Sequence, residues 1–150
     1  MTIRSVLIGV ALAVLASGQA FASAKTDAVA AIQKWMDDFN RGELAPASCS
    51  GVVSLVDDIP PHEWHGEGAC AAWAKDFSAW ATAHEVTNGS VKLGKVRHVD
   101  ASGQSAYVVA ATSFTGSMKD KPFSMKGLIT VSLKKAESGW VITGWAWADL

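Results

Sequence analysis

The chain has 150 residues, of which 49% are hydrophobic and 18% are charged, and its formal net charge is −1 at pH 7. These values are typical of one ordinary globular domain. They exclude the strongly basic surface that nucleic acids or anionic membranes require, so we expect neither as a partner.

Residues 1–22, MTIRSVLIGVALAVLASGQAFA, have the pattern of a secretory signal peptide. Arg4 precedes an apolar run that begins at Val6, and Ala20 and Ala22 form an AxA cleavage site. The run is shorter than the roughly 20 residues that span a membrane, which argues against the alternative of an uncleaved anchor. We therefore expect a periplasmic or secreted protein with no membrane attachment after cleavage. Without Arg4 its formal charge is about −2, since 12 basic residues face 14 acidic ones.

The two cysteines, Cys49 and Cys70, are predicted to form a disulfide because an oxidising compartment allows thiols to pair. The bond would close a loop of about 20 residues and stabilise the fold by roughly 3 kcal/mol. The alternative of a nucleophilic cysteine needs a base partner, and the sequence points to none.

The first predicted helix covers residues 26–40, TDAVAAIQKWMDDFN. Its apolar residues recur at helical spacing, with Trp35 beside them: Val29, Ile32, Met36 and Phe39. Gly42 is a natural helix terminator. The next apolar run, VVSLVDDI at residues 52–59, predicts a strand.

The second predicted helix, GACAAWAKDFSAWATAH, carries one aromatic face: Ala69, Trp73, Phe77, Trp80 and His84. From Asn88 onward the helical period disappears, and turn signals at NG, DASG, MKDKP and ESG divide the rest into about four strands. The clearest strand is FSMKGLITVSL, residues 123–133, with one apolar and one polar face. Gly127 falls on its apolar face, where it marks either a bend or room for a ligand.

These elements predict a single α+β domain over residues 25–150, in which a curved antiparallel sheet wraps around the helices. The expected order is α-β-α-β-β-β-β.

Three stretches carry a resemblance to a known family: AIQKWMDDFNRGEL, SLVDDIPPHEWHGEGACAAW and GWVITGWAWA. In this order they resemble the nuclear transport factor 2-like superfamily, including its SnoaL-like and ketosteroid isomerase-like members. The resemblance implies a cone-shaped fold with a pocket at its open end. Carried onto this sequence, it implies a pocket wall that includes Trp35, Phe39, His62, Trp64, Tyr107, Met125, Trp145 and Trp147, with Asp57 or Asp58 beside them.

Steroid isomerase chemistry is not expected, because the residues depart from the pattern that this activity needs. Trp35 stands where the resemblance implies a tyrosine, Ile59 where it implies the base, and Ile129 near the position of the protonated acid. A simpler acid–base chemistry remains as an alternative, in which Asp57 or Asp58 acts as a general base with a histidine as partner. Adjacent strand residues point to opposite faces, so we expect only one of these acids to face the pocket, with a slight preference for Asp57. The alternative is that both are solvated acids at a strand end.

The segment HEWH, from His62 to His65, is one residue short of the HExxH zinc motif. Prolines precede it and Gly66 follows, so we expect it to be extended and to run back beside the preceding strand. No third ligand is indicated, and we expect no metal and no other cofactor. Most of the seven tryptophans are expected to pack in the core.

The sequence therefore predicts an exported domain that binds a small, largely apolar molecule. The alternatives are a cofactor-free isomerase, cyclase or hydrolase that uses Asp57 or Asp58 as its base, and a structural module that forms a homodimer through the outer face of its sheet.

Overall fold

The computed structural model describes residues 9–46, 48–49 and 51–150, with side chains described from Ser23 onward. Residues 1–8 of the predicted signal peptide lie outside this range, and for residues 9–22 the structure gives a helical backbone. The elements follow in the order α1 (Gly9–Asn40), β1 (Val52–Val56), β2 (Glu63–Glu67), α2 (Ala69–Ala83), β3 (Val86–Ser102), β4 (Ser105–Met118), β5 (Lys121–Ala136) and β6 (Gly139–Asp149).

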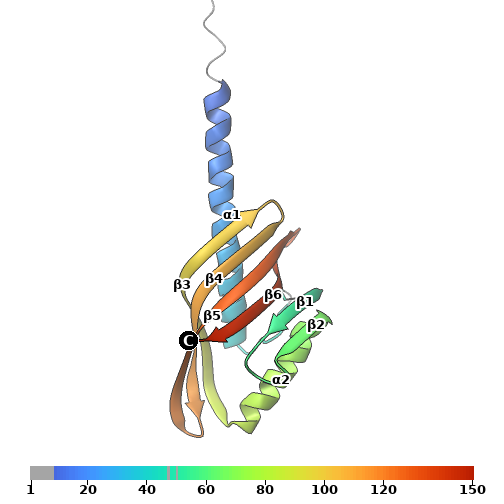
Figure 1. Ribbon diagram of the computed structural model, residues 1–150, viewed down its shortest axis with the longest axis vertical. Coiled ribbons are helices and arrows are strands. Elements are labelled where there is room, and N and C mark those ends of the chain that lie inside the picture. The colour runs from blue at the N-terminus through green and yellow to red at the C-terminus, as the bar shows by residue number, and fades with distance from the viewer. Residues whose placement is uncertain (1–8, 47, 50) are drawn as a thin grey trace, which may run out of the picture.

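The six strands form one sheet in the order β2-β1-β6-β5-β4-β3. All neighbours are antiparallel except β1 and β6, which run parallel. The sheet curves, and the C-terminal half of α1 and the whole of α2 lie on its concave side (Figure 1). The predicted α+β class and curved sheet are therefore confirmed.

The structure corrects two details of the predicted order and adds residues to the first helix. HEWHG is extended and pairs with β1, as expected, but it forms a true strand, β2, so the order becomes α-β-β-α-β-β-β-β. The NG signal at Asn88 and Gly89 is not a turn between strands; it lies at a register shift within the long strand β3, where Asn88 has a φ of 53°. Helix α1 begins at Gly9 and not near Thr26, since the preceding alanine-rich segment favours helix.

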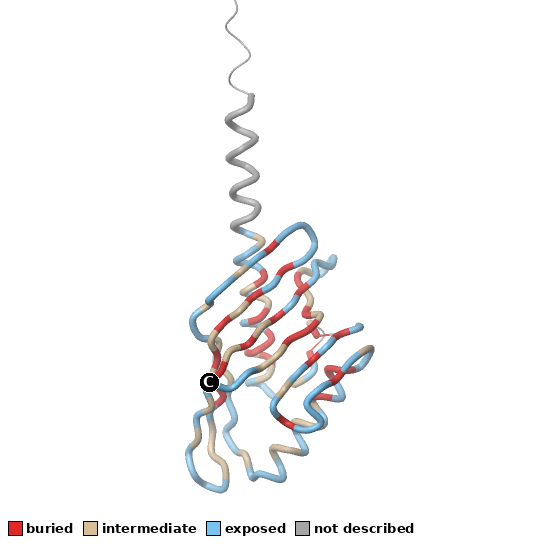
Figure 2. Tube along the Cα trace, viewed as in Figure 1, coloured by how far each residue is buried: buried red, intermediate tan, exposed pale blue. Residues whose placement is uncertain are grey.

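Buried positions alternate along β4 and β5, as expected for a sheet with one covered face (Figure 2). The inward side chains of these strands belong to the same hydrophobic core as the apolar face of α1, where Ile32 and Met36 are completely buried. The side chain of Asn40 extends this contact, because it donates a 2.9 Å hydrogen bond to the Val91 carbonyl and accepts one of 2.8 Å from the Val91 N–H. These bonds fix the end of α1 to β3.

Gly144 lets β1 lie directly against β6. A Cβ atom at this position would come within 2.7 Å of the Ser54 carbonyl oxygen, closer than real Cβ contacts allow. The close parallel pairing places the end of β1, with Asp57 just beyond it, beside the inner face of β6. Among the described residues, no helix is both long enough and apolar enough to cross a membrane.

Candidate functional site

A half-enclosed cavity of about 70 Å³ lies on the concave side of the sheet, between the two helices and strands β3 to β6. Its aromatic lining residues are Trp35, Phe39, Trp73, Phe77, Trp80, Phe114, Trp145 and Trp147. The remaining lining residues are Met36, Asp57, Asp58, Ile59, Val91, Thr112, Met125 and Ile129. The lining is thus largely aromatic, and Asp57 and Asp58 are the only ionisable side chains among the described residues that form it.

Helical spacing builds the aromatic wall. On α2, Trp73, Phe77 and Trp80 lie on one face, with ring centroids 5.4 Å apart for the first pair and 5.9 Å for the second. On α1, Trp35 and Phe39 are four residues apart and therefore share a face. Phe39 meets Phe77 at 5.2 Å, edge to face, so the two helices contact each other through aromatic rings.

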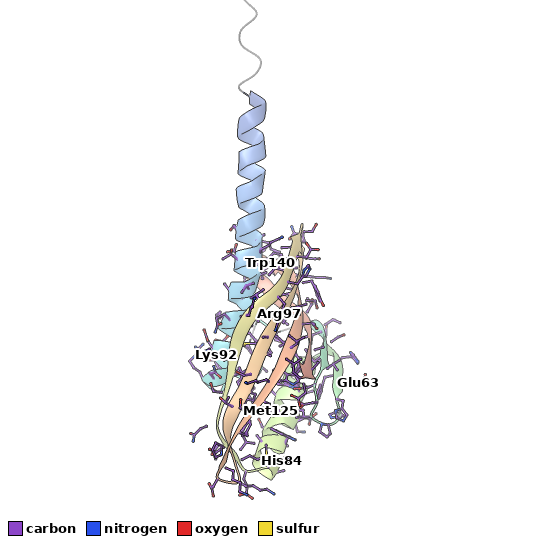
Figure 3. The ribbon with its side chains drawn as sticks, turned by 60° about the vertical axis from the view of Figure 1, so that its left-hand side comes forward. Glu63, His84, Lys92, Arg97, Met125 and Trp140 are labelled. Carbon is purple, nitrogen blue, oxygen red and sulfur yellow. A yellow bond between two sulfur atoms is a disulfide. The ribbon has the colours of Figure 1, made fainter. Side chains whose placement is uncertain are left out.

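Strand β6 contributes the floor. The ring of Trp145 lies 5.6 Å from that of Trp35 and 5.1 Å from that of Trp73, and so joins both helices. Two residues further on, Trp147 lies over Gly127, where a Cβ atom would come within 2.8 Å of the indole ring. Gly127 therefore leaves room for a side chain of the protein itself. Met125 lies at the opposite end of the sheet from Trp140, which does not line the cavity (Figure 3).

Both acids line the cavity, which corrects the expectation that only one of them would face it. The strand alternation behind that expectation does not reach them, because β1 ends at Val56. Beyond that point the chain turns, and the Asp58 N–H donates a 2.9 Å hydrogen bond to Asp57 Oδ1. Asp57 is half-buried and Asp58 is exposed.

Asp57 is the polar centre of the site. Its Oδ2 accepts a 2.7 Å hydrogen bond from Trp73 Nε1, within the wall of the cavity. Burial raises the pKa of Asp57 to about 7, the Trp73 hydrogen bond opposes this rise, and the neighbouring Asp58 carboxyl adds to it. At neutral pH the carboxyl can therefore both accept and release a proton.

A second tryptophan–aspartate pair holds the same wall in place. Trp64 on β2 donates a 2.8 Å hydrogen bond to Asp76 Oδ2 on α2. Helix α2 thus gives a donor to the loop after β1 through Trp73 and accepts one from β2 through Asp76. Because the two bonds attach α2 to two different segments, the loop after β1 and strand β2, they hold the helix in place against both.

Of the predicted pocket residues, the structure places Trp35, Phe39, Met125, Trp145 and Trp147 in the cavity lining. Ile59 and Ile129, the two apolar departures from the steroid isomerase pattern, also line it.

Three predicted pocket residues lie elsewhere. Trp64 is buried, but its indole is engaged with Asp76 outside the lining. His62 is exposed, with Nδ1 3.3 Å from the Asp57 carbonyl oxygen. Tyr107 is 44% exposed on the outer face of the sheet, since its neighbours in β4 point inward, and its ring lies 6.1 Å from that of His98.

Sequence reasoning missed four aromatic residues of the lining: Trp73, Phe77, Trp80 and Phe114. The aromatic face of α2 was visible in the sequence, but it was assigned to core packing. Phe114 lies on β4, which is apolar on both faces, so its sequence gives no signal of which residues point inward.

The predicted disulfide between Cys49 and Cys70 is present. Both residues are buried, and Cys70 is the second residue of α2. The disulfide therefore links the loop after α1 to the start of the helix that carries the aromatic wall.

The HEWH segment does not gather ligands for a metal. His65 Nε2 lies 3.3 Å from Glu63 Oε2 on the exposed face of β2, while His62 lies before the strand. Within the part of the chain that the structure describes, no three histidine, cysteine or acidic side chains are grouped so that they could hold an ion.

Three solved structures have a similar fold, and the similarity covers most of this chain and most of each of theirs. An NTF2-like protein with a cystatin-like fold from Novosphingobium aromaticivorans has a TM-score of 0.72 and 14% identity, over 91% of this chain and 88% of that one. An NTF2-like superfamily protein from Salmonella enterica serovar Typhimurium has a TM-score of 0.69 and 15% identity, over 85% and 92% of the two chains. A ketosteroid isomerase-like protein from Erwinia carotovora atroseptica has a TM-score of 0.64 and 18% identity, over 84% and 95%.

The chain has the NTF2-like cone fold. The resemblance that the sequence suggested is therefore confirmed at the level of fold. No protein-family model matches the chain, and no curated protein is significantly similar to it in sequence. At these identities the likeness defines the fold alone, so the function has to be argued from the cavity.

Proposed function

We propose that this NTF2-like domain binds a small, largely apolar molecule in the aromatic cavity. The observation that carries the proposal is the lining itself, in which aromatic and aliphatic side chains surround one half-buried carboxyl group. Binding sites for small molecules have this composition: mostly apolar walls with a few polar groups that fix orientation.

The volume limits the size of the ligand. A cavity of about 70 Å³ is far smaller than the roughly 300–1,000 Å³ of pockets that enclose drug-sized molecules. We therefore expect the enclosed part of the ligand to be no larger than a single ring or a branched alkyl group, with any remainder extending through the open side.

Blocking the cavity tests this function. Met125→Trp on the lining should fill the cavity, whereas Ser124→Trp, one residue earlier on the exposed face of β5, adds the same side chain outside it. Calorimetric titration with small ring compounds should show binding to the wild type and to Ser124→Trp, and none to Met125→Trp. Equal binding to all three proteins would reject the cavity as the site.

A second function, acid–base catalysis, is favoured by one observation: a carboxyl whose pKa is about 7 lines an apolar cavity. An isomerase, cyclase or hydrolase could use Asp57 as a cofactor-free base. If so, Asp57→Asn should abolish turnover of the substrate while Asp58→Asn retains most of it, and kcat/KM should rise with pH around 7. A rate that is unchanged in Asp57→Asn would exclude this role.

Export is part of the same proposal. The disulfide between Cys49 and Cys70 supports an oxidising compartment such as the periplasm or the exterior. The signal peptide and the homodimer stay predictions. Mass spectrometry of the protein recovered from an exporting host should find a chain that starts after Ala22, and a chain that retains Met1 would contradict cleavage.

A further inference from the structure

We propose that the molecule bound in this cavity is an organic cation, with an ammonium group seated among the aromatic rings beside Asp57. The inference rests on the proposed binding function and specifies the chemical class of the ligand.

The first argument is charge. The two ionisable lining residues are both acids, and no described lysine, arginine or histidine lines the cavity. The ion pairs among the described residues join Asp38 to Lys34 and Arg41, and Glu63 to His65. Neither Asp57 nor Asp58 takes part in one, so the negative charge of the cavity is not compensated within the described part of the chain.

The second argument is the surface that the rings present. Indole N–H edges are positive and would repel a cation, but in three of the five lining tryptophans they are engaged or covered. Trp73 Nε1 is hydrogen-bonded to Asp57, and the Nε1 atoms of Trp145 and Trp147 are covered by neighbouring atoms. Aromatic faces carry negative potential and attract ammonium groups, most strongly where water is excluded.

The third argument is the carboxyl itself. A neutral apolar ligand that covered Asp57 would remove its remaining water and offer no charge in return, which makes the ionised form more costly. A cation offsets that cost. It would also pull the pKa of Asp57 down from about 7, so that the carboxylate stays ionised in the complex. Asp58 and His62 on the same loop contact Asp57, and Asp76 on α2 is engaged by Trp64.

The test compares two molecules of nearly the same shape. Choline carries a trimethylammonium group, and 3,3-dimethylbutan-1-ol carries a neutral tert-butyl group in its place. Both are titrated calorimetrically into the protein at pH 8, with sodium chloride added to the alcohol series to match ionic strength. We expect choline to bind at least about tenfold more tightly, a ratio in the range of cation–π and carboxylate contacts.

Charge on Asp57 should set that ratio. In Asp57→Asn, and in the wild type at pH 5 where Asp57 is protonated, the preference for choline should fall to about threefold or less. Circular dichroism checks that the variant is folded, and the pH series on the wild type tests the same charge without a substitution. Asp100→Asn, an exposed acid on β3, should leave the ratio unchanged.

Several outcomes would overturn the inference. If the alcohol binds as tightly as choline, the ligand is not selected for charge, and the proposed function of binding an apolar molecule survives. If choline binds but Met125→Trp or Asp57→Asn does not weaken it, the cation binds elsewhere. If neither molecule binds while single-ring compounds do, the cation is rejected and the cavity is kept; if ring compounds also fail, the proposed function fails with it.

Discussion

The indole N–H of Trp73 donates a 2.7 Å hydrogen bond to the carboxyl group of Asp57. This contact joins the aromatic wall of the cavity to its polar centre, and it also ties α2 to the loop after β1. Under the proposed function, stability and ligand binding therefore depend on the same pair of residues.

Trp73→Phe should lower the free energy of unfolding at neutral pH by about 1–3 kcal/mol, because a hydrogen bond to a buried charge is lost while a ring remains. The pKa of Asp57 should rise further, since this bond holds it down. Urea unfolding and carboxyl-carbon NMR titration measure the two effects. Trp140→Phe is the matched control, because Trp140 is buried and its Nε1 has no partner. Equal effects of the two variants on Asp57 would contradict the assigned role of the bond.

Asp57→Asn should change how stability depends on pH. Burial raises the pKa of Asp57 from its ordinary value of 3.8 to about 7, so between these values the folded state holds a proton that the unfolded state has released. The contribution of Asp57 to stability therefore falls as pH rises through this window and is constant above it. Relative to the wild type, Asp57→Asn should gain stability across the window and be more stable at pH 8 by about 1 kcal/mol or more.

Urea unfolding at pH 4, 6 and 8 checks this expectation, with the exposed Asp100→Asn as control. A difference between Asp57→Asn and the wild type that does not change with pH would show that the pKa of Asp57 is the same in the folded and unfolded states, and would contradict the raised pKa.

Gly127→Ala should destabilise the protein by about 1–3 kcal/mol through overpacking. The new methyl group would lie 2.5 Å from the Ala148 carbonyl oxygen and 2.8 Å from the Trp147 ring, both of which would have to move. Trp147 should then shift in the cavity and ligand binding should weaken. Thermal unfolding and calorimetry check both effects. Ser124→Ala, at an exposed position of the same strand, should change neither the Tm nor the ligand affinity. An unchanged Tm for Gly127→Ala would mean that the ring of Trp147 has room to retreat.

The pair of substitutions Cys49→Ser and Cys70→Ser should lower the free energy of unfolding by roughly 3 kcal/mol, the loop-entropy value for a separation of 21 residues. Thiol titration of the unreduced, unfolded wild type should find no free cysteine. Two titratable thiols would refute the disulfide.

Periodic patterns made most of the fold predictable. The four-, four- and three-residue spacings from Ala69 to Trp80 define α2. The alternation of residues 123–133 defines the two faces of β5: Ile129 is buried on the inward face and Lys126 is exposed on the outward face. Each pattern is local, so it can be read without knowing what the element packs against.

The candidate site depends on relations that are not local. Whether Asp57 and Asp58 both reach the cavity depends on where β1 ends, and the apolar run continues to Ile59 without marking that point. Tyr107 points outward because of the register of β4 against its neighbours, as Ser132 and Asp100 lie opposite it. Trp73 and Trp80 have the spacing of core residues. They line a cavity because α1, α2 and the sheet leave a space between them, and the sequence does not show that space.

The indole N–H signals of the seven tryptophans give the most direct test of the central claim, that the aromatic cavity beside Asp57 is a ligand-binding site. Five tryptophans line the cavity, while Trp64 and Trp140 do not and serve as internal controls. The measurement is a ¹H–¹⁵N NMR titration with choline and with a single-ring compound. We predict that binding shifts the signals of Trp73, Trp145 and Trp147 and leaves those of Trp64 and Trp140 unchanged; shifts confined to Trp64 and Trp140, or no shift at all, would contradict the account.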